Sequence, residues 1–216
     1  PWSLANLQPF SQVDGEGIWQ PYLTNTKGEV VSYRTFLKPD PERPYALVAV
    51  VAVDLSKTRL HFVLGVDEPA KPGGIHGDGL IPEADKQPGK LLAAFNGGFI
   101  YEHGQYGAMA NGVTPLGGRE GLATLAIAPN GDVRIGEWKI DLPSEEKWEA
   151  WRQNALMILH DGAVNPKVET GSYLEWGANL DGATITVRSS VGLSADNQVL
   201  YYFAGQGDSV STVGVY

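Results

Sequence analysis

The sequence predicts an α+β fold dominated by strands: a mixed, twisted sheet with few helices and with long loops at one edge. Short runs of apolar and β-branched residues, such as 45–54 and 185–192, have the length and composition of strands. The 27 glycines indicate many turns between short strands. Only one segment, residues 143–154, has the features of a helix, so an all-β fold is the alternative.

The N-terminal part of the chain predicts three strands and one stiff connection. Residues 30–37 alternate loosely between polar and apolar side chains, as half-buried strands do. Residues 38–44 carry three prolines, which neither helices nor central strands tolerate. Residues 45–54 are nearly all apolar, which is typical of a strand covered on both faces, and residues 59–66 form its neighbour. We therefore expect an N-terminal strand and covering segment over residues 1–43, and the main domain over residues 44–216.

Two long loops are expected around the middle of the chain, over residues 67–90 and 100–121. The first is rich in glycine, proline and charge, and a loop of this length is usually functional or mobile. Its His76 and Asp78 do not supply the three or four ligands that a metal site needs, so no metal is expected. The second loop carries Glu102, His103 and Tyr106 among other polar residues, and is either the rim of a site or a surface excursion.

The following segment predicts a hairpin, a helix and a buried strand. Residues 122–128 and 132–138 flank Asn130 and Gly131, a dipeptide typical of tight hairpins. Residues 143–154 are expected to be helical, with Trp148 and Trp151 on one face. We expect that face to pack on the sheet rather than to bind a sugar. Residues 155–160 are expected to be a buried strand that ends at Asp161 and Gly162.

Two further segments carry the candidate binding groups. An apolar run over residues 91–95 predicts a buried strand that ends at Asn96, Gly97, Gly98 and Phe99. Paired glycines permit positive φ, and the turn either points backbone N–H groups at an anion or is a plain tight turn. Arg188 lies within residues 185–192, which with 198–203 predict strand, turn and strand. Its guanidinium either faces solvent at a sheet edge or binds a carboxylate or phosphate.

Together these segments resemble the phosphodiester glycosidase family, whose best-known member removes N-acetylglucosamine from phosphorylated mannose. The family pattern has a strand leading into Asn-Gly-Gly-Phe, then an Asp-Gly turn, then an Arg-Ser/Thr-x-x-Gly strand that enters a hairpin. The matching residues here are Asn96 to Phe99, Asp161 with Gly162, and Arg188 to Gly192, within a resemblance that covers roughly residues 44 to 208. The resemblance implies a secreted or envelope hydrolase that cleaves sugar-1-phosphodiesters without a cofactor.

The site residues follow from this resemblance and from the chemistry of the bond. Breaking it passes through an oxocarbenium-like state while the phosphate leaves as an anion. Arg188, Ser189 and the backbone of Gly97 and Gly98 are expected to bind the phosphate, and Asn96 the sugar. Asp161 is the expected catalytic carboxylate and His160 the expected acid or base, with Arg188 assisting catalysis.

The chain also departs from the family pattern. Members continue past the arginine hairpin into an Asn-Leu-Asp-Gly-Gly-type segment, whereas the similar residues 179–182 precede Arg188 here. Asp208 is a weaker carboxylate candidate. We expect a further C-terminal segment or a second chain to complete the site; the alternative is that catalysis has been lost.

Composition limits the partners. The formal net charge of −9 disfavours nucleic acid, and no apolar run approaches the roughly 20 residues that span a bilayer. The absence of cysteine removes disulfides and thiol catalysis. A start at proline instead of methionine indicates either processing or further residues upstream, and a removed signal peptide, as in a secreted protein, would fit it. The alternatives to a phosphodiesterase-type site are a non-catalytic binder of phosphorylated or acidic glycans, a surface-assembly domain, and a glycosidase with two carboxylates about 5–10 Å apart.

Overall fold

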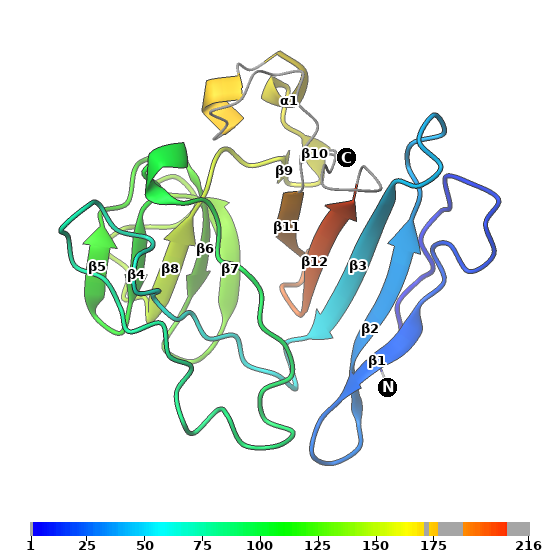
Figure 1. Cartoon of the computed structure of the whole chain (residues 1–216), viewed down its shortest axis with the longest axis horizontal. Coiled ribbons are helices and arrows are strands. Elements are labelled where there is room, and N and C mark those ends of the chain that lie inside the picture. The colour runs from blue at the N-terminus through cyan, green and yellow to red at the C-terminus, as the bar shows by residue number, and fades with distance from the viewer. Residues whose placement is uncertain (1, 171–172, 177–187, 207–216) are drawn as a thin grey trace. The chain divides into compact units, whose positions relative to one another are not determined.

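The structure is a computed structural model that describes residues 2–170, 173–176 and 188–206 (Figure 1). The strands are β1 (Gln20–Thr24), β2 (Val30–Leu37), β3 (Leu47–Asp54), β4 (Ala108–Ala110), β5 (Val113–Leu116), β6 (Ala123–Ile127), β7 (Val133–Glu137), β8 (Ala150–Gln153), β9 (Leu159–His160), β10 (Ala163–Val164), β11 (Arg188–Leu193) and β12 (Val199–Gln206). The helical pieces are the 3-10 turns η1 (Tyr101–His103) and η2 (Tyr173–Trp176) and the short helix α1 (Lys167–Thr170).

The fold is all-β, so the α+β prediction was wrong and the alternative fits. The described strands form three sheets, and every strand pair in them is antiparallel rather than mixed. The longest described helical piece has four residues. No described helix has the length and apolar character needed to cross a membrane.

The chain divides into two compact units. The first contains residues 1–58, 88–92 and 183–216, and the second contains residues 59–87 and 93–182. The boundary expected between residues 43 and 44 lies within the first unit, and that expected division stays a prediction.

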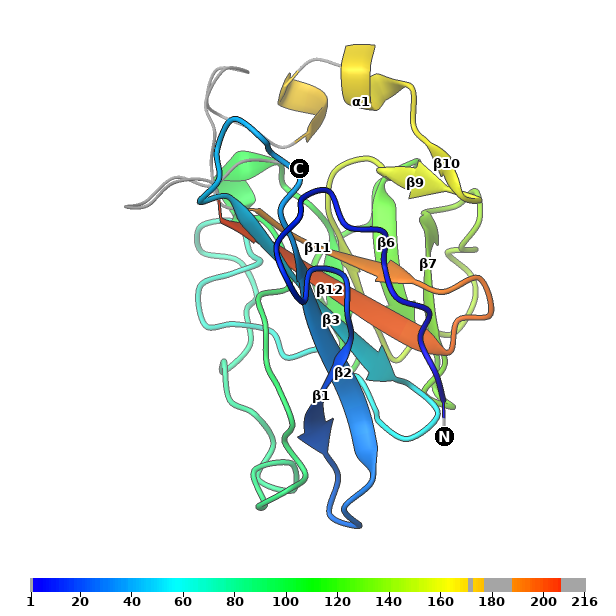
Figure 2. The ribbon, with the colours of Figure 1, turned by 90° about the vertical axis from the view of Figure 1, so that its right-hand side faces the viewer.

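The first unit is built on a five-stranded sheet in the order β1-β2-β3-β12-β11, whose strands lie side by side in both views (Figure 1 and Figure 2). Three sequence predictions are confirmed here. The strand expected over residues 30–37 is β2, the run over 45–54 contains β3, and the late strand–turn–strand is the β11–β12 hairpin. Val50 and Ala52 of β3 are fully buried, as expected of a central strand.

A buried carboxylate joins the N-terminal segment of the first unit to the end of β2. Glu16 is 4% exposed, and its oxygens accept hydrogen bonds from the backbone N–H groups of Phe10, Ser11 and Lys38 and from the Ser11 hydroxyl. Burial raises the pKa of this carboxyl, but the hydrogen bonds favour the ionised form more strongly and lower the pKa to about 2. The ionised carboxylate therefore stabilises this unit.

The second unit is built on a five-stranded sheet in the order β5-β4-β8-β6-β7. The β6–β7 hairpin with its Asn130-Gly131 turn confirms the prediction for residues 122–138. Side chains pack on both faces of the sheet. One cluster contains Leu64, Ala108, Ala110, Ile127 and Ala150, and the other contains Ala126, Trp138, Leu142, Trp148 and Trp151.

The helix predicted over residues 143–154 does not form. Residues 144–146 make a turn, and Ala150–Gln153 is the central strand β8, with all four residues buried. The two tryptophans do pack inward as expected, and Trp151 lies with its ring centroid 4.8 Å from that of Trp138. The prediction relied on the spacing of Trp148 and Trp151 and did not consider Arg152 and Gln153, whose side chains are buried and hydrogen-bonded to loops in strand β8.

Three further strand predictions were wrong, and one loop is more ordered than expected. Residues 59–66 are extended and place Leu60, Phe62 and Leu64 in the core, but they pair with no described strand. Residues 91–95 form no strand, and the segment 155–160 contains only the two residues of β9, of which Leu159 is exposed. The expected loop 100–121 contains η1, β4 and β5. For the three wrong strand predictions, the sequence has an apolar or extended run, but such a run forms a strand only where a neighbouring strand offers hydrogen-bond partners.

Replacing Glu16 with glutamine should destabilise the first unit. The native pKa of about 2 lies below the ordinary value of 4.5, so the stabilisation is fully present above about pH 4.5 and is lost as the pH falls towards 2. The difference between these two pKa values corresponds to roughly 3 kcal/mol at neutral pH. The free energy of unfolding is measured as a function of pH by urea titration, with hydrogen exchange of β2 and β3 as the readout for the first unit. Glu42→Gln, at an exposed position of the same unit, is the control, and equal pH dependence in wild type and Glu16→Gln would contradict the assignment.

Candidate functional site

The Asn-Gly-Gly-Phe corner lies in the second unit and is held by a residue that follows β8. The Phe99 N–H donates to Asn154 Oδ1 at 3.2 Å, and Asn154 Nδ2 donates to the Gly97 carbonyl at 3.4 Å. Gly98 has φ of 138°, and a Cβ there would overlap the Asn154 amide, so only glycine fits. The conformation of the corner is therefore fixed by hydrogen bonds to Asn154 and by the requirement for glycine at position 98. The buried strand that was expected before the corner is absent.

The corner lies at the surface of the second unit. Asn96, Gly97 and Gly98 are exposed, and within the described part of the chain the N–H groups of the two glycines donate to no other residue. Successive backbone N–H groups of this kind can bind an anion. The geometry is thus compatible with the expected role of Gly97 and Gly98.

The guanidinium of Arg152 holds Phe99, the last residue of the corner. Its Nη2 donates to the Phe99 carbonyl, and its Nη1 donates to the carbonyls of Tyr106 at 2.6 Å and Gly107 at 3.3 Å. Burial lowers the pKa of this guanidinium to about 10, while the charge of Glu68 acts in the opposite direction. A charged side chain from β8 therefore holds together two loop segments that are separated in sequence.

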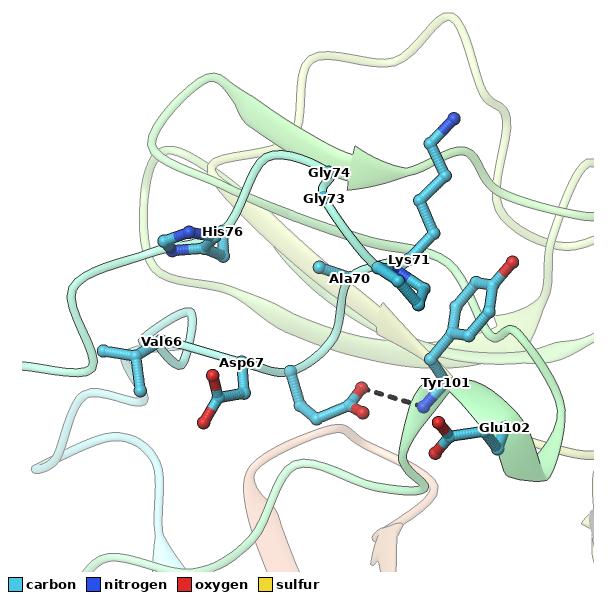
Figure 3. Close-up of a pocket in the computed structure, with 11 residues that line it drawn as sticks. Val66, Asp67, Ala70, Lys71, Gly73, Gly74, His76, Tyr101 and Glu102 are labelled. Atoms are coloured by element: carbon cyan, nitrogen blue, oxygen red, sulfur yellow. Dashed lines mark hydrogen bonds between the residues drawn. The ribbon is translucent and has the colours of Figure 1, made fainter.

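A pocket of about 460 Å³ lies between the two predicted loops of this unit (Figure 3). It is lined by Val66, by residues 67–68, 70–74 and 76 of the first loop, and by Tyr101 and Glu102, which come two and three residues after the corner. Glu68 Oε2 accepts the Tyr101 N–H at 2.8 Å and so ties the two loops together. The sequence analysis named His76 and Glu102 as residues of these two loops, but it did not predict that both would line one pocket.

The pocket is rich in carboxylates. Asp67, Glu68 and Glu102 line it together with a single lysine, Lys71. The ammonium group of Lys71 extends away from the Asp67 and Glu102 carboxylates in Figure 3, and among the described residues no ion pair involves any of the three acids. Such a pocket accepts hydrogen bonds from hydroxyl groups and repels phosphate.

His160 and Asp161 lie in the small β9–β10 hairpin of the second unit. Asp161 and Gly162 form its two-residue turn, with φ of 49° and 77°, and Asp161 is exposed. His160 Nε2 lies 3.3 Å from Asp141 Oδ2. The imidazole of His160 is thus paired with a carboxylate that the sequence analysis did not single out.

Arg188 and Ser189 lie in the first unit, at the start of β11. Both are partly exposed, and β11 is at the edge of the described sheet, where Arg188 is opposite Gly205 of β12. Burial lowers the pKa of Arg188. The expectation that Arg188 and the corner form one site stays a prediction. Residues 179–182 and Asp208 lie outside the described residues.

The site residues that sequence reasoning missed are Asp67, Glu68, Lys71, Arg152 and Asn154. Arg152 and Asn154 were hidden by the helix assigned to residues 143–154, because a strand there would have directed attention to buried polar side chains. The pocket residues gave no pattern in the sequence, since they are brought together by loops alone.

Replacing Gly98 with alanine should loosen the corner. The added Cβ would meet Asn154 at a φ that alanine rarely adopts, which costs about 1–3 kcal/mol. Thermal unfolding and hydrogen exchange at Phe99 measure the effect. Gly117→Ala is the matched control, because no atom lies within 4 Å of a Cβ built there. The same stability in both variants would show that the corner is not constrained.

No protein-family model matches this sequence, and no curated protein matches it. The resemblance to phosphodiester glycosidases therefore rests on three short motifs, at Asn96 to Phe99, at Asp161 with Gly162, and at Arg188 to Gly192.

Proposed function

We propose that the protein hydrolyses a sugar-1-phosphodiester in an extracellular or envelope glycan. One observation carries this proposal: the exposed corner, whose two glycine N–H groups have no acceptor among the described residues, leads directly into residues that line a carboxylate-rich pocket. A phosphate needs hydrogen-bond donors, which the corner supplies, and sugar hydroxyls can donate to hydrogen-bond acceptors, which the pocket carboxylates supply.

In this proposal the N–H groups of Gly97 and Gly98 bind the phosphate. Arg188, whose guanidinium fork matches a phosphate bidentately, keeps the phosphate-binding role that the resemblance implies. Asn96 and the pocket carboxylates bind the sugar hydroxyls. Water adds to the anomeric carbon, the bond from that carbon to the phosphate oxygen breaks, and the products are the free sugar and a phosphate monoester.

Glu102 is the pocket carboxylate that we assign to the oxocarbenium-like transition state. Glu68 is engaged by the Tyr101 N–H and by the charge of Arg152, so it positions the pocket. Glu102 is exposed and lies three residues beyond the corner, with no ion-pair partner among the described residues. A carboxylate near the anomeric carbon stabilises the developing cation. The roles expected for Asp161 and His160 stay predictions.

A non-catalytic glycan-binding protein is the second candidate. The pocket favours it, because carboxylates and an aromatic residue such as Tyr101 suffice to bind sugar hydroxyls without a phosphate. Binding of a sugar without turnover of any phosphodiester would support this candidate over the first.

Hydrolysis should be visible with a panel of sugar 1-(methyl phosphate) diesters that includes N-acetylglucosamine, by ³¹P NMR of the methyl phosphate released. In ¹⁸O-labelled water the label should enter the sugar, because the carbon–oxygen bond breaks. Arg188→Lys should lower kcat/KM by about tenfold or more, and Glu102→Gln should lower it by about 100-fold.

The control is Glu83→Gln, which removes an exposed carboxylate that pairs with Lys86 outside the pocket. It should leave turnover unchanged. Wild-type turnover by Arg188→Lys would refute the phosphate contact, and label in the methyl phosphate would refute cleavage at the anomeric carbon.

A further inference from the structure

The turn that follows β7 is built so that an aspartate folds back over the strand end. The Glu137 carbonyl accepts hydrogen bonds from the N–H groups of Ile140, Asp141 and Leu142, at 3.1, 2.9 and 3.2 Å. Asp141 Oδ2 in turn accepts the Glu137 N–H at 2.8 Å. A Cβ at Gly136 would lie 2.8 Å from the Asp141 Cβ, so glycine leaves room for this arrangement. The Asp141 carboxylate is therefore held in place by the backbone.

A histidine from a second segment of the same unit completes the group. The two-residue turn at Asp161 and Gly162 directs the β9–β10 hairpin, which leads into α1 (Figure 2), and His160 Nε2 lies 3.3 Å from Asp141 Oδ2. One ligand atom each from Glu137, Asp141 and His160 lies within 4.8 Å of the others.

The pairing of His160 with Asp141 does not explain why the carboxylate of Glu137 lies beside them. Two carboxylates this close repel each other unless a cation or a proton lies between them. Within the described parts of the chain, no lysine or arginine forms an ion pair with Glu137 or Asp141. The one cationic partner that Asp141 has among the described residues is the imidazole of His160, which can itself be a metal ligand.

We propose that Glu137, Asp141 and His160 bind a divalent metal ion of the Zn²⁺ class. One imidazole nitrogen and two carboxylates are a donor set that zinc accepts, with a fourth position open to water. Bonds of about 2.1 Å in tetrahedral geometry place ligand atoms about 3.4 Å apart, so small side-chain movements from the observed spacing are enough. The nitrogen donor disfavours Ca²⁺ and Mg²⁺, which prefer oxygen ligands.

The ion would join two parts of the second unit. Strands β9 and β10 have two residues each and form a separate sheet, and such a hairpin is marginal on its own. A metal bound by Glu137, Asp141 and His160 fastens this hairpin to the end of β7. The evidence for this site and its readout concern binding and do not use the proposed hydrolysis, although a metal-bound His160 would not be the acid or base expected from the sequence.

Titration calorimetry of the whole chain with Zn²⁺, after treatment with a chelator, tests the site. The wild type should bind one equivalent that His160→Ala and Glu137→Gln each weaken by about tenfold or more. X-ray absorption of the zinc-loaded protein should show one imidazole and carboxylate oxygens. Zn²⁺ should also slow hydrogen exchange in residues 159–164 of the wild type but not of His160→Ala.

His61→Ala is the matched control, because His61 is also paired with an aspartate in this unit, with Nδ1 2.7 Å from Asp85 Oδ2, but has no third ligand among the residues that the structure describes. It should bind Zn²⁺ as the wild type does. The proposal is overturned if the wild type binds no Zn²⁺, or if His160→Ala and Glu137→Gln keep the wild-type affinity.

Discussion

The arrangement of the second unit depends on the buried guanidinium of Arg152. Burying a cation is costly, and here three backbone carbonyls and the charge of Glu68 offset the cost. Because the carbonyls belong to Phe99, Tyr106 and Gly107, the side chain joins the Asn-Gly-Gly-Phe corner to the entry of β4. Tyr101 and Glu102 lie between these attachment points, so the pocket is positioned by the same interaction.

Much of the sheet structure could be predicted, because it is specified locally. The alternation over residues 30–37 and the Asn130-Gly131 turn identify β2 and the β6–β7 hairpin without knowledge of the rest of the chain. Strand β8 could not be identified, because the partners of Arg152 and Gln153 are carbonyls more than 30 residues away. Because residues 143–154 were therefore predicted to be a helix, the sequence analysis favoured an α+β fold over the all-β fold.

The candidate site was predicted in part. The corner was found from its glycines, and the structure adds that Asn154 and Arg152 hold it. The pocket was missed, because its carboxylates come from irregular loops in which no spacing marks a site. His160 was selected for acid–base chemistry, whereas its nearest charged partner is Asp141, in a turn that only the folded chain brings beside it. A sequence pattern thus identifies residues with tight local constraints better than it identifies their partners.

Hydrogen exchange of Arg152→Met, compared with the wild type, tests the role of this guanidinium most directly. Arg59→Met is the control, because Arg59 of the same unit is bonded to one carbonyl, that of Asn130. Loss of the Arg152 contacts should cost about 2–4 kcal/mol and raise exchange across residues 99–107, while the β6–β7 hairpin stays protected. Unchanged protection of residues 99–107 in Arg152→Met would contradict the account.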